Sequence, residues 1–75
     1  MAKLYEIDYK RIGERIKKIR EDNNLTLRDL AKELNTTSST ISAYETGKTL
    51  ILTAFAYQIC IKYNVSLDWL CGKRK

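Results

Sequence analysis

Histidine is absent from this 75-residue chain, and cysteine occurs only twice. The two cysteines, Cys60 and Cys71, do not form a Cys-x-x-Cys pair. Zinc sites need Cys and His ligands at such short spacings, and a thiol nucleophile needs a nearby base. Neither a zinc site nor a Cys-His catalytic pair is therefore available, and we expect Cys60 to pack as a small core residue.

Other features of active sites are missing as well. The chain has three glycines but no glycine-rich loop for a phosphate group, and no close pair of carboxylates is visible on one helix face. These absences argue against an enzyme. We expect no catalytic residue, no metal, no cofactor and no small-molecule ligand.

Long apolar runs are also absent. The longest apolar-rich run, residues 50–61, includes Thr53 and Gln58. It is shorter than the roughly 20 residues that a membrane-spanning helix needs. No stretch combines the basic start, apolar block and small-residue cleavage site of a signal peptide. We therefore expect a cytoplasmic protein that does not bind membranes.

The composition that remains is that of one small globular domain, with 44% apolar and 31% charged residues. Its net charge of +5 favours a polyanionic partner. The charge is concentrated at the ends: seven basic and three acidic residues lie in 1–20, four and six in 21–72, and three basic residues in 73–75. The ends attract DNA phosphates if they face a duplex. Otherwise they form a solvated helix face and a solubilising tail, which is the preferred interpretation for 73–75.

The most informative stretch is residues 25–47, which reads as two short helices joined by a tight corner. Thr26 is placed to cap the first helix, and Leu30, Ala31 and Leu34 give it an apolar stripe. Asn35 tolerates the left-handed backbone that ends a helix. In the second helix, Thr37 is the expected cap, Ile41 and Tyr44 point inward, and Gly47 ends the helix. Such short helices are stable only when packed together.

The solvent side of the second helix carries Ser38, Ser39, Ser42 and Ala43, and the helix has no Lys or Arg. A slim face of hydroxyl groups can lie deep in a DNA groove and contact base edges. The alternative is that these serines are simply solvated.

The stretch resembles the helix-turn-helix of phage repressors and their bacterial relatives, the lambda repressor-like family of Cro/CI or XRE type. The resemblance covers about residues 9–72 without a gap. It rests on Ile12, Gly13, Glu14, Arg15, Ile16, Arg20, Leu25, Thr26, Leu30, Ala31, Leu34, Ile41, Ser42, Tyr44, Glu45, Gly47, Lys48 and the run from Val65 through Ser66, Leu67, Asp68 and Trp69 to Leu70.

The resemblance implies an all-α, compact five-helix domain over residues 1–75, with the helix-turn-helix at 26–46. It implies a sequence-specific, DNA-binding transcriptional regulator, a phage- or prophage-type repressor that binds a near-palindromic operator through the major groove as a homodimer. The alternative is a protein-interaction module such as an antitoxin, in which DNA binding is secondary and the apolar fourth helix covers a partner.

The family pattern also implies roles for individual residues. Arg20 is expected to pair with Glu45 at the surface and to orient the recognition helix while lying near a phosphate. Leu27 stands where relatives often have Gln, so only its backbone amide remains for a phosphate. The implied base contacts are Thr37, Ser38, Ser39, Ser42 and Ala43, and the implied phosphate contacts are Arg20, Thr26, Leu27, Thr46, Lys48 and Thr49.

After Gly47 the chain departs from the family. Relatives usually carry several basic residues and a proline in this loop, whereas this chain has Lys48 alone and no proline anywhere. The apolar residues 50–52 either pack on the core or meet a second copy, and we expect partial burial with a share in a dimer contact. The predicted dimer interface is formed by Leu50, Ile51, Leu67, Trp69 and Leu70.

Three further helices are predicted, over residues 9–22, 53–63 and 67–71. Asp8 is the expected cap of the first, with Ile12, Ile16 and Ile19 inward. Ser66 is the expected cap of the last. In residues 53–63 the inward positions are Ala56, Ile59, Cys60 and Tyr63. Residues 1–8 form either an irregular lead-in or an arm that packs on a neighbour.

Overall fold

A computed structural model of the chain describes residues 7–72. In this part the chain forms five helices and no strand: α1 (Tyr9–Asp22), α2 (Leu27–Glu33), α3 (Ser38–Glu45), α4 (Thr53–Lys62) and α5 (Leu67–Leu70). The predicted all-α, five-helix class is confirmed. The predicted ends at 63 and 71 are each one residue too far, because Tyr63 and Cys71 are the C-caps of α4 and α5. Most of residues 1–8 and all of 73–75, whose roles the sequence leaves as predictions, lie outside the described residues.

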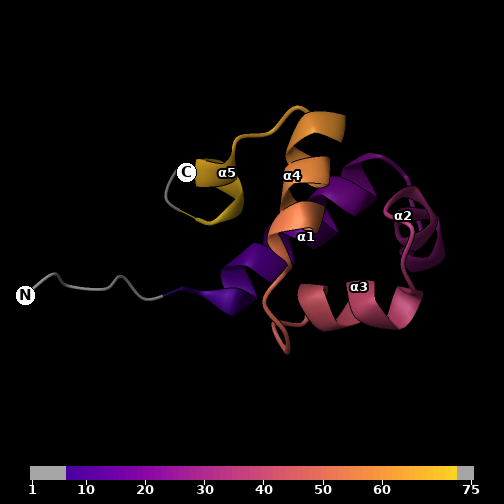
Figure 1. The fold of residues 1–75 in the computed structure, drawn as a ribbon, viewed down its shortest axis with the longest axis horizontal. Helices are drawn as coiled ribbons and strands as arrows, with labels where there is room; N and C mark the ends of the chain where they lie inside the picture. Colours follow the sequence, from indigo (N-terminus) through magenta and orange to yellow (C-terminus); the bar gives the residue numbers. More distant parts are fainter. Residues whose placement is uncertain (1–6, 73–75) are drawn as a thin grey trace, which may run out of the picture.

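The helices pack around α1, which runs through the middle of the view in Figure 1, with α3 below it and α5 above. α3 packs on both α1 and α2, and α5 packs on both α1 and α4. None of the helices in residues 7–72 has the length and apolar content of a membrane span.

Each of the five helices contributes one side chain that is at most 1% exposed: Ile16, Leu30, Ile41, Ile59 and Leu70. Around them lie the other buried apolar residues Ile12, Ile19, Ala31, Leu34, Tyr44 and Ala56. The predicted inward residues of α1, α2 and α3 are all in this cluster. Cys60 and Tyr63 are half-buried at its edge instead. Leu70 was expected in a dimer interface, but it belongs to the core of the single chain, so its side chain offers no surface to a partner.

The helix ends follow from residue type. The side chains of Asp8, Thr26, Thr37 and Ser66 each accept a hydrogen bond from a backbone amide three residues later, at 3.0 to 3.2 Å, so the four predicted caps are confirmed. Asn24, Asn35 and Asn64 follow α1, α2 and α4 with φ values of 54° to 56°. Asparagine thus takes the left-handed position that glycine takes after α3, at Gly47.

Gly13 allows α1 to approach the end of α3 closely. A Cβ atom placed on Gly13 would overlap the carbonyl oxygens of Tyr44 and Glu45 and lie 2.8 Å from the carbonyl carbon of Glu45. Only glycine fits between these two backbones. The position of α3 against α1 therefore depends on the missing side chain of Gly13.

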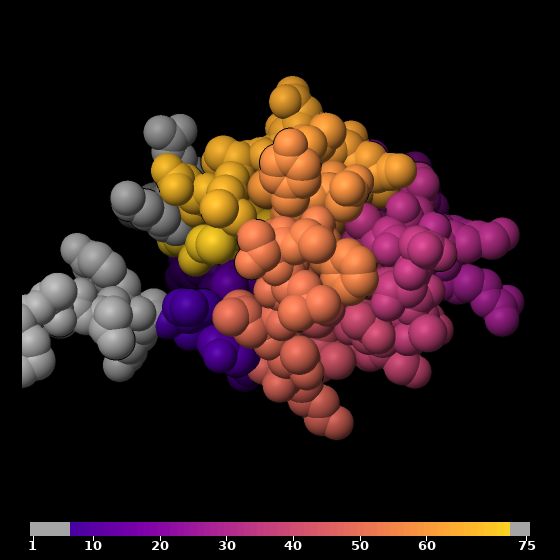
Figure 2. All heavy atoms as spheres, in the orientation of Figure 1, coloured from indigo at the N-terminus to yellow at the C-terminus, as the bar shows by residue number. Residues whose placement is uncertain are grey.

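α4 lies across the face shown in Figure 2, between α5 and the side of the molecule formed by α2 and α3. Two of its large apolar side chains are mostly exposed, Tyr57 at 63% and Ile61 at 62%. They are four residues apart and so share one face of the helix. This face is the apolar surface of α4 that the core leaves uncovered.

Candidate nucleic-acid interface

The outward face of α3 carries the predicted base-contacting residues. Ile41 and Tyr44 are buried and fix the helix against the core, which turns the serines outward. Ser38 and Ser39 are exposed in the first turn, and Ser42 and Ala43 are half-buried one turn later. The cap residue Thr37 is exposed and shares a hydrogen bond with Thr40, at 3.0 Å between the two hydroxyl oxygens.

These residues line an open, shallow depression, together with residues from the start of α2 and the loop after α3. Its lining consists of Leu27, Ser38, Ser39, Ser42, Ala43, Thr46 and Lys48. Four of the five predicted base contacts and three of the six predicted phosphate contacts are therefore brought together on one surface. Thr37, Arg20, Thr26 and Thr49 do not line it.

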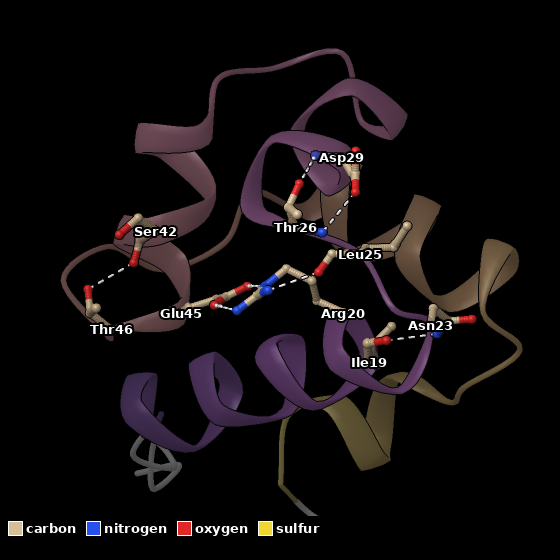
Figure 3. Close-up of polar contacts among 9 residues, drawn as sticks. All are labelled: Ile19, Arg20, Asn23, Leu25, Thr26, Asp29, Ser42, Glu45 and Thr46. Atoms are coloured by element: carbon tan, nitrogen blue, oxygen red, sulfur yellow. Dashed lines mark hydrogen bonds and ion pairs between the residues drawn. The ribbon is translucent and has the colours of Figure 1, made fainter.

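The hydrogen bonds of the loop limit what its residues can offer to a ligand. The Thr46 hydroxyl donates to the carbonyl of Ser42, at 3.0 Å (Figure 3). A phosphate contact by this hydroxyl would require that hydrogen bond to break, because the group has only one proton. The backbone amides of Lys48 and Thr49 both donate to the carbonyl of Ala43, at 3.0 and 3.3 Å. Only the side chains of Lys48 and Thr49, both exposed, remain for phosphate.

At the start of α2, Thr26 and Asp29 form a reciprocal capping box. The Asp29 amide donates to the Thr26 hydroxyl at 3.0 Å, and the Thr26 amide donates to the Asp29 carboxylate at 2.9 Å (Figure 3). This second bond lowers the pKa of Asp29 below its ordinary value. The spacing Thr-x-x-Asp is the sequence signal for this box, whereas the prediction from sequence includes only the Thr26 cap. Among the hydrogen bonds of the described residues, none is donated by the amides of Leu27 and Arg28, so these remain available to a phosphate.

Arg20 and Glu45 form the predicted ion pair between α1 and α3. The Nε and Nη2 atoms of Arg20 lie 2.7 and 3.1 Å from the two carboxylate oxygens of Glu45. Arg20 Nη1 also donates to the carbonyl of Leu25, at 2.9 Å (Figure 3). The pair was expected at the surface, but the side chains are only 14% and 6% exposed. The hydrogen bond to Glu45 raises the pKa of Arg20 above its ordinary value.

The residues predicted at a dimer interface differ in exposure. Leu50 and Ile51 are half-buried against the core, and Leu67 is 55% exposed. Trp69 is half-buried, and its ring lies under the guanidinium of Arg15, 4.8 Å from the ring centroid. An Arg15 nitrogen also donates to the carbonyl of Trp69. Among the predicted interface residues, Leu67 is therefore the most exposed.

The described part of the chain holds no cluster of His, Cys, Asp and Glu that suits a metal ion. Cys60 and Cys71 are free thiols. Burial raises the pKa of the Cys60 thiol above its ordinary value.

Comparison with known proteins shows the family to which the chain belongs. Residues 13–73 match the helix-turn-helix domain family. The antitoxin PezA of Streptococcus pneumoniae is 33% identical over 64 residues, which is 85% of this chain and 40% of PezA. The chain thus spans less than half the length of this relative.

Solved structures share the fold. The biofilm regulator SinR in complex with DNA is 27% identical, with a TM-score of 0.69 over 79% of this chain and 95% of SinR. The P22 c2 repressor in complex with a synthetic operator is 22% identical, with a TM-score of 0.76 over 84% of this chain and 96% of the repressor. The family match spans most of the chain, and the chain belongs to the helix-turn-helix domain family, in its lambda repressor-like, XRE-type group.

Proposed function

We propose that the chain binds double-stranded DNA sequence-specifically and regulates transcription, with α3 in the major groove. The observation that carries this proposal is the depression that unites the serine face of α3 with Leu27 and Lys48. Family membership and the DNA complex of the similar regulator SinR support it.

The diameter of α3 matches the width of the DNA major groove. The major groove is about 12 Å wide, and an α-helix with its side chains is about 10–12 Å across. The short side chains of Ser38, Ser39 and Ser42 keep α3 at the slim end of that range. Their hydroxyls can donate or accept, so each discriminates weakly between bases. Part of the specificity then comes from DNA shape and bridging water.

We further propose that the chain acts as a homodimeric repressor of phage or prophage type. Two copies related by a two-fold axis place their α3 helices about 34–36 Å apart, one turn of the duplex, on a near-palindromic operator. The exposed Leu67 and the half-buried Leu50, Ile51 and Trp69 supply the contact between copies.

A second candidate is an antitoxin-like module whose main partner is a protein. It is favoured by the similarity to PezA and by the exposed apolar face of α4, which carries Tyr57 and Ile61. In that case α4 is covered by the partner, and DNA binding is secondary.

The two candidates are separated by selecting bound duplexes from a random DNA pool at near-physiological salt. The DNA-binding regulator yields an enriched motif with two half-sites about ten base pairs apart. Retention that is only salt-sensitive, with no motif, contradicts this role and favours the interaction module.

A charge-matched pair of variants localises the binding surface in the same selection. Ser39→Glu adds a carboxylate to the exposed face of α3, and Gln58→Glu adds one to the exposed side of α4. We expect the first to abolish enrichment and the second to leave it intact. Equal loss in both variants would show that α3 is not the reading helix.

A further inference from the structure

We propose that Lys10, at the start of α1, forms a DNA phosphate contact beside that of Lys48. This contact rests on the DNA binding proposed above. It assigns a role to one residue of the basic excess in residues 1–20.

The first observation is the position of the turn that ends α3. Gly47 has a φ of 78° and lies directly against Lys10: a Cβ atom placed on Gly47 would be 3.1 Å from Lys10 Cα and 3.3 Å from Lys10 Cγ. Lys48, which lines the depression, is the next residue of this turn. The start of α1 therefore borders the candidate interface. Figure 1 shows the α3–α4 loop beneath the first turns of α1.

The second observation is the orientation of α1. Gly13 and Arg20 share one side of this helix with Lys10, by helical spacing. Both meet the end of α3, Gly13 through the backbone of Tyr44 and Glu45 and Arg20 through its ion pair with Glu45. The side of α1 that carries Lys10 is thus the side turned toward the recognition helix.

The third observation is the charge around this site. α3 itself has no basic residue, and Lys48 is the only one between α3 and α4. Lys10 is exposed, and in the described part of the chain no carboxylate lies within 4 Å of its ammonium group. Lys18, by contrast, is paired with Asp22. The ammonium group of Lys10, with no carboxylate near it among the described residues, can bind a phosphate at the rim of the depression. It adds a positive charge beside a loop that has only Lys48 as a basic residue.

Arg11 provides a matched control because it follows Lys10 directly but lies on another side of α1. Its Cγ is 3.1 Å from where a Cβ on Gly72 would stand, so its side chain runs along the end of α5. In Figure 1, α5 and α3 lie on opposite sides of α1. The two neighbouring cations therefore face different surroundings.

The test compares Lys10→Gln, Arg11→Gln and Lys48→Gln with the unaltered chain. Affinity for one duplex is measured between 50 and 200 mM salt, using the selected motif or, without one, a random-sequence duplex. Each phosphate contact contributes about 0.9 to the slope of log K against log salt. We expect Lys10→Gln and Lys48→Gln each to flatten the slope by about 0.9, and Arg11→Gln to leave it unchanged. Ethylation interference then shows two different phosphates, one lost in each lysine variant.

The outcomes separate this inference from the function on which it rests. If the unaltered chain binds and Lys48→Gln flattens the slope while Lys10→Gln does not, the Lys10 contact is wrong and DNA binding stands. If Arg11→Gln flattens the slope as much as Lys10→Gln, the effect is general charge loss and the Lys10 contact is wrong. If the unaltered chain binds no duplex, both proposals fail. Lys10 is exposed, so unchanged thermal unfolding of Lys10→Gln confirms that folding is not the cause.

Discussion

The guanidinium of Arg20 holds both carboxylate oxygens of Glu45 and the carbonyl of Leu25, so one side chain of α1 fixes both the last residue of α3 and the segment before α2. The pair is almost removed from solvent. Removal of one member would leave the other charge poorly solvated, which is costlier than the loss of an exposed pair.

We predict that Glu45→Gln lowers the free energy of unfolding by about 1.5–3 kcal/mol, the range for hydrogen bonds to charged groups. Urea denaturation measures the change. Lys18→Gln is the control, since it breaks the exposed pair with Asp22 and costs no more than about 0.5 kcal/mol. Equal costs in the two variants would mean that burial of the Arg20–Glu45 pair contributes nothing.

A second prediction concerns Gly13→Ala. In an unobstructed helix this change stabilises by about 1 kcal/mol. Here the new methyl group meets the backbone of Tyr44 and Glu45, so we expect destabilisation by about 1–3 kcal/mol, as for an overpacked core. Thermal or urea unfolding gives the sign. A stabilised variant would show that α1 and α3 do not approach this closely.

The third prediction concerns acid stability. Because the fold lowers the pKa of Asp29, its charged form stabilises the protein above the unfolded pKa, which is about 3.9. This contribution is lost as the pH falls through the lower folded pKa. We expect the free energy of unfolding of Asp29→Asn to depend less on pH below about 4 than that of the unaltered chain.

Thr26→Ala complements this experiment, since it removes the other half of the capping box. We expect a cost of about 1 kcal/mol at neutral pH. The same pH titration of Thr26→Ala should show a smaller weakening of the acid dependence: the backbone amide of Thr26, the larger cause of the lowered pKa of Asp29, remains, and only the hydroxyl, the second cause, is removed. If the acid dependence of the free energy of unfolding is unchanged in both variants, the capping box is not the source of that dependence.

The fourth prediction separates a residue that selects the base sequence from a residue that binds a phosphate. Ser38→Ala should relax the base preference at one position of the selected motif, whereas Lys48→Ala should weaken all duplexes alike and flatten the salt slope by about 0.9. Binding to a panel of single-base operator variants measures the difference. If both substitutions act alike on every duplex, these roles are wrongly assigned.

The fifth prediction distinguishes two apolar surfaces. Leu67→Glu should weaken self-association if the dimer forms through the predicted interface, and Ile61→Glu should not. Both side chains are mostly exposed, so neither change should unfold the chain. Sedimentation velocity over a range of concentrations measures association. The reverse result would place the contact on α4 and remove Leu67 from it.

The sequence predicted those features that depend on local residue chemistry. The caps at Asp8, Thr26, Thr37 and Ser66 and the left-handed Asn35 follow from side chains that hydrogen-bond to or tolerate particular backbone geometry. The buried stripes follow from helical periodicity. The serine face of α3 follows from the spacing of residues along the helix, and the resemblance to a known family supplied the pairing of Arg20 with Glu45.

Features that depend on how helices cross could not be read from periodicity. The close approach at Gly13, the burial of the Arg20–Glu45 pair and the different sides of Lys10 and Arg11 all arise from tertiary packing. Leu70 shows the same limit, because an apolar residue in a short helix suits a core and an interface equally well. The hydrogen bond from the Thr46 hydroxyl to the Ser42 carbonyl likewise depends on the geometry at the end of α3, which periodicity does not show.

Each helix contributes one fully buried side chain to the core, and this has a consequence for the cooperativity of unfolding. Among the helices of residues 7–72, none is longer than 14 residues, and helices of this length are marginal in water on their own. If α5 detaches, for instance, Leu70 leaves the core cluster that also contains Ile16, Leu30, Ile41 and Ile59, and that core is exposed to water. The domain should therefore unfold in a single all-or-none step, and α3 holds its shape only while the other four helices are in place.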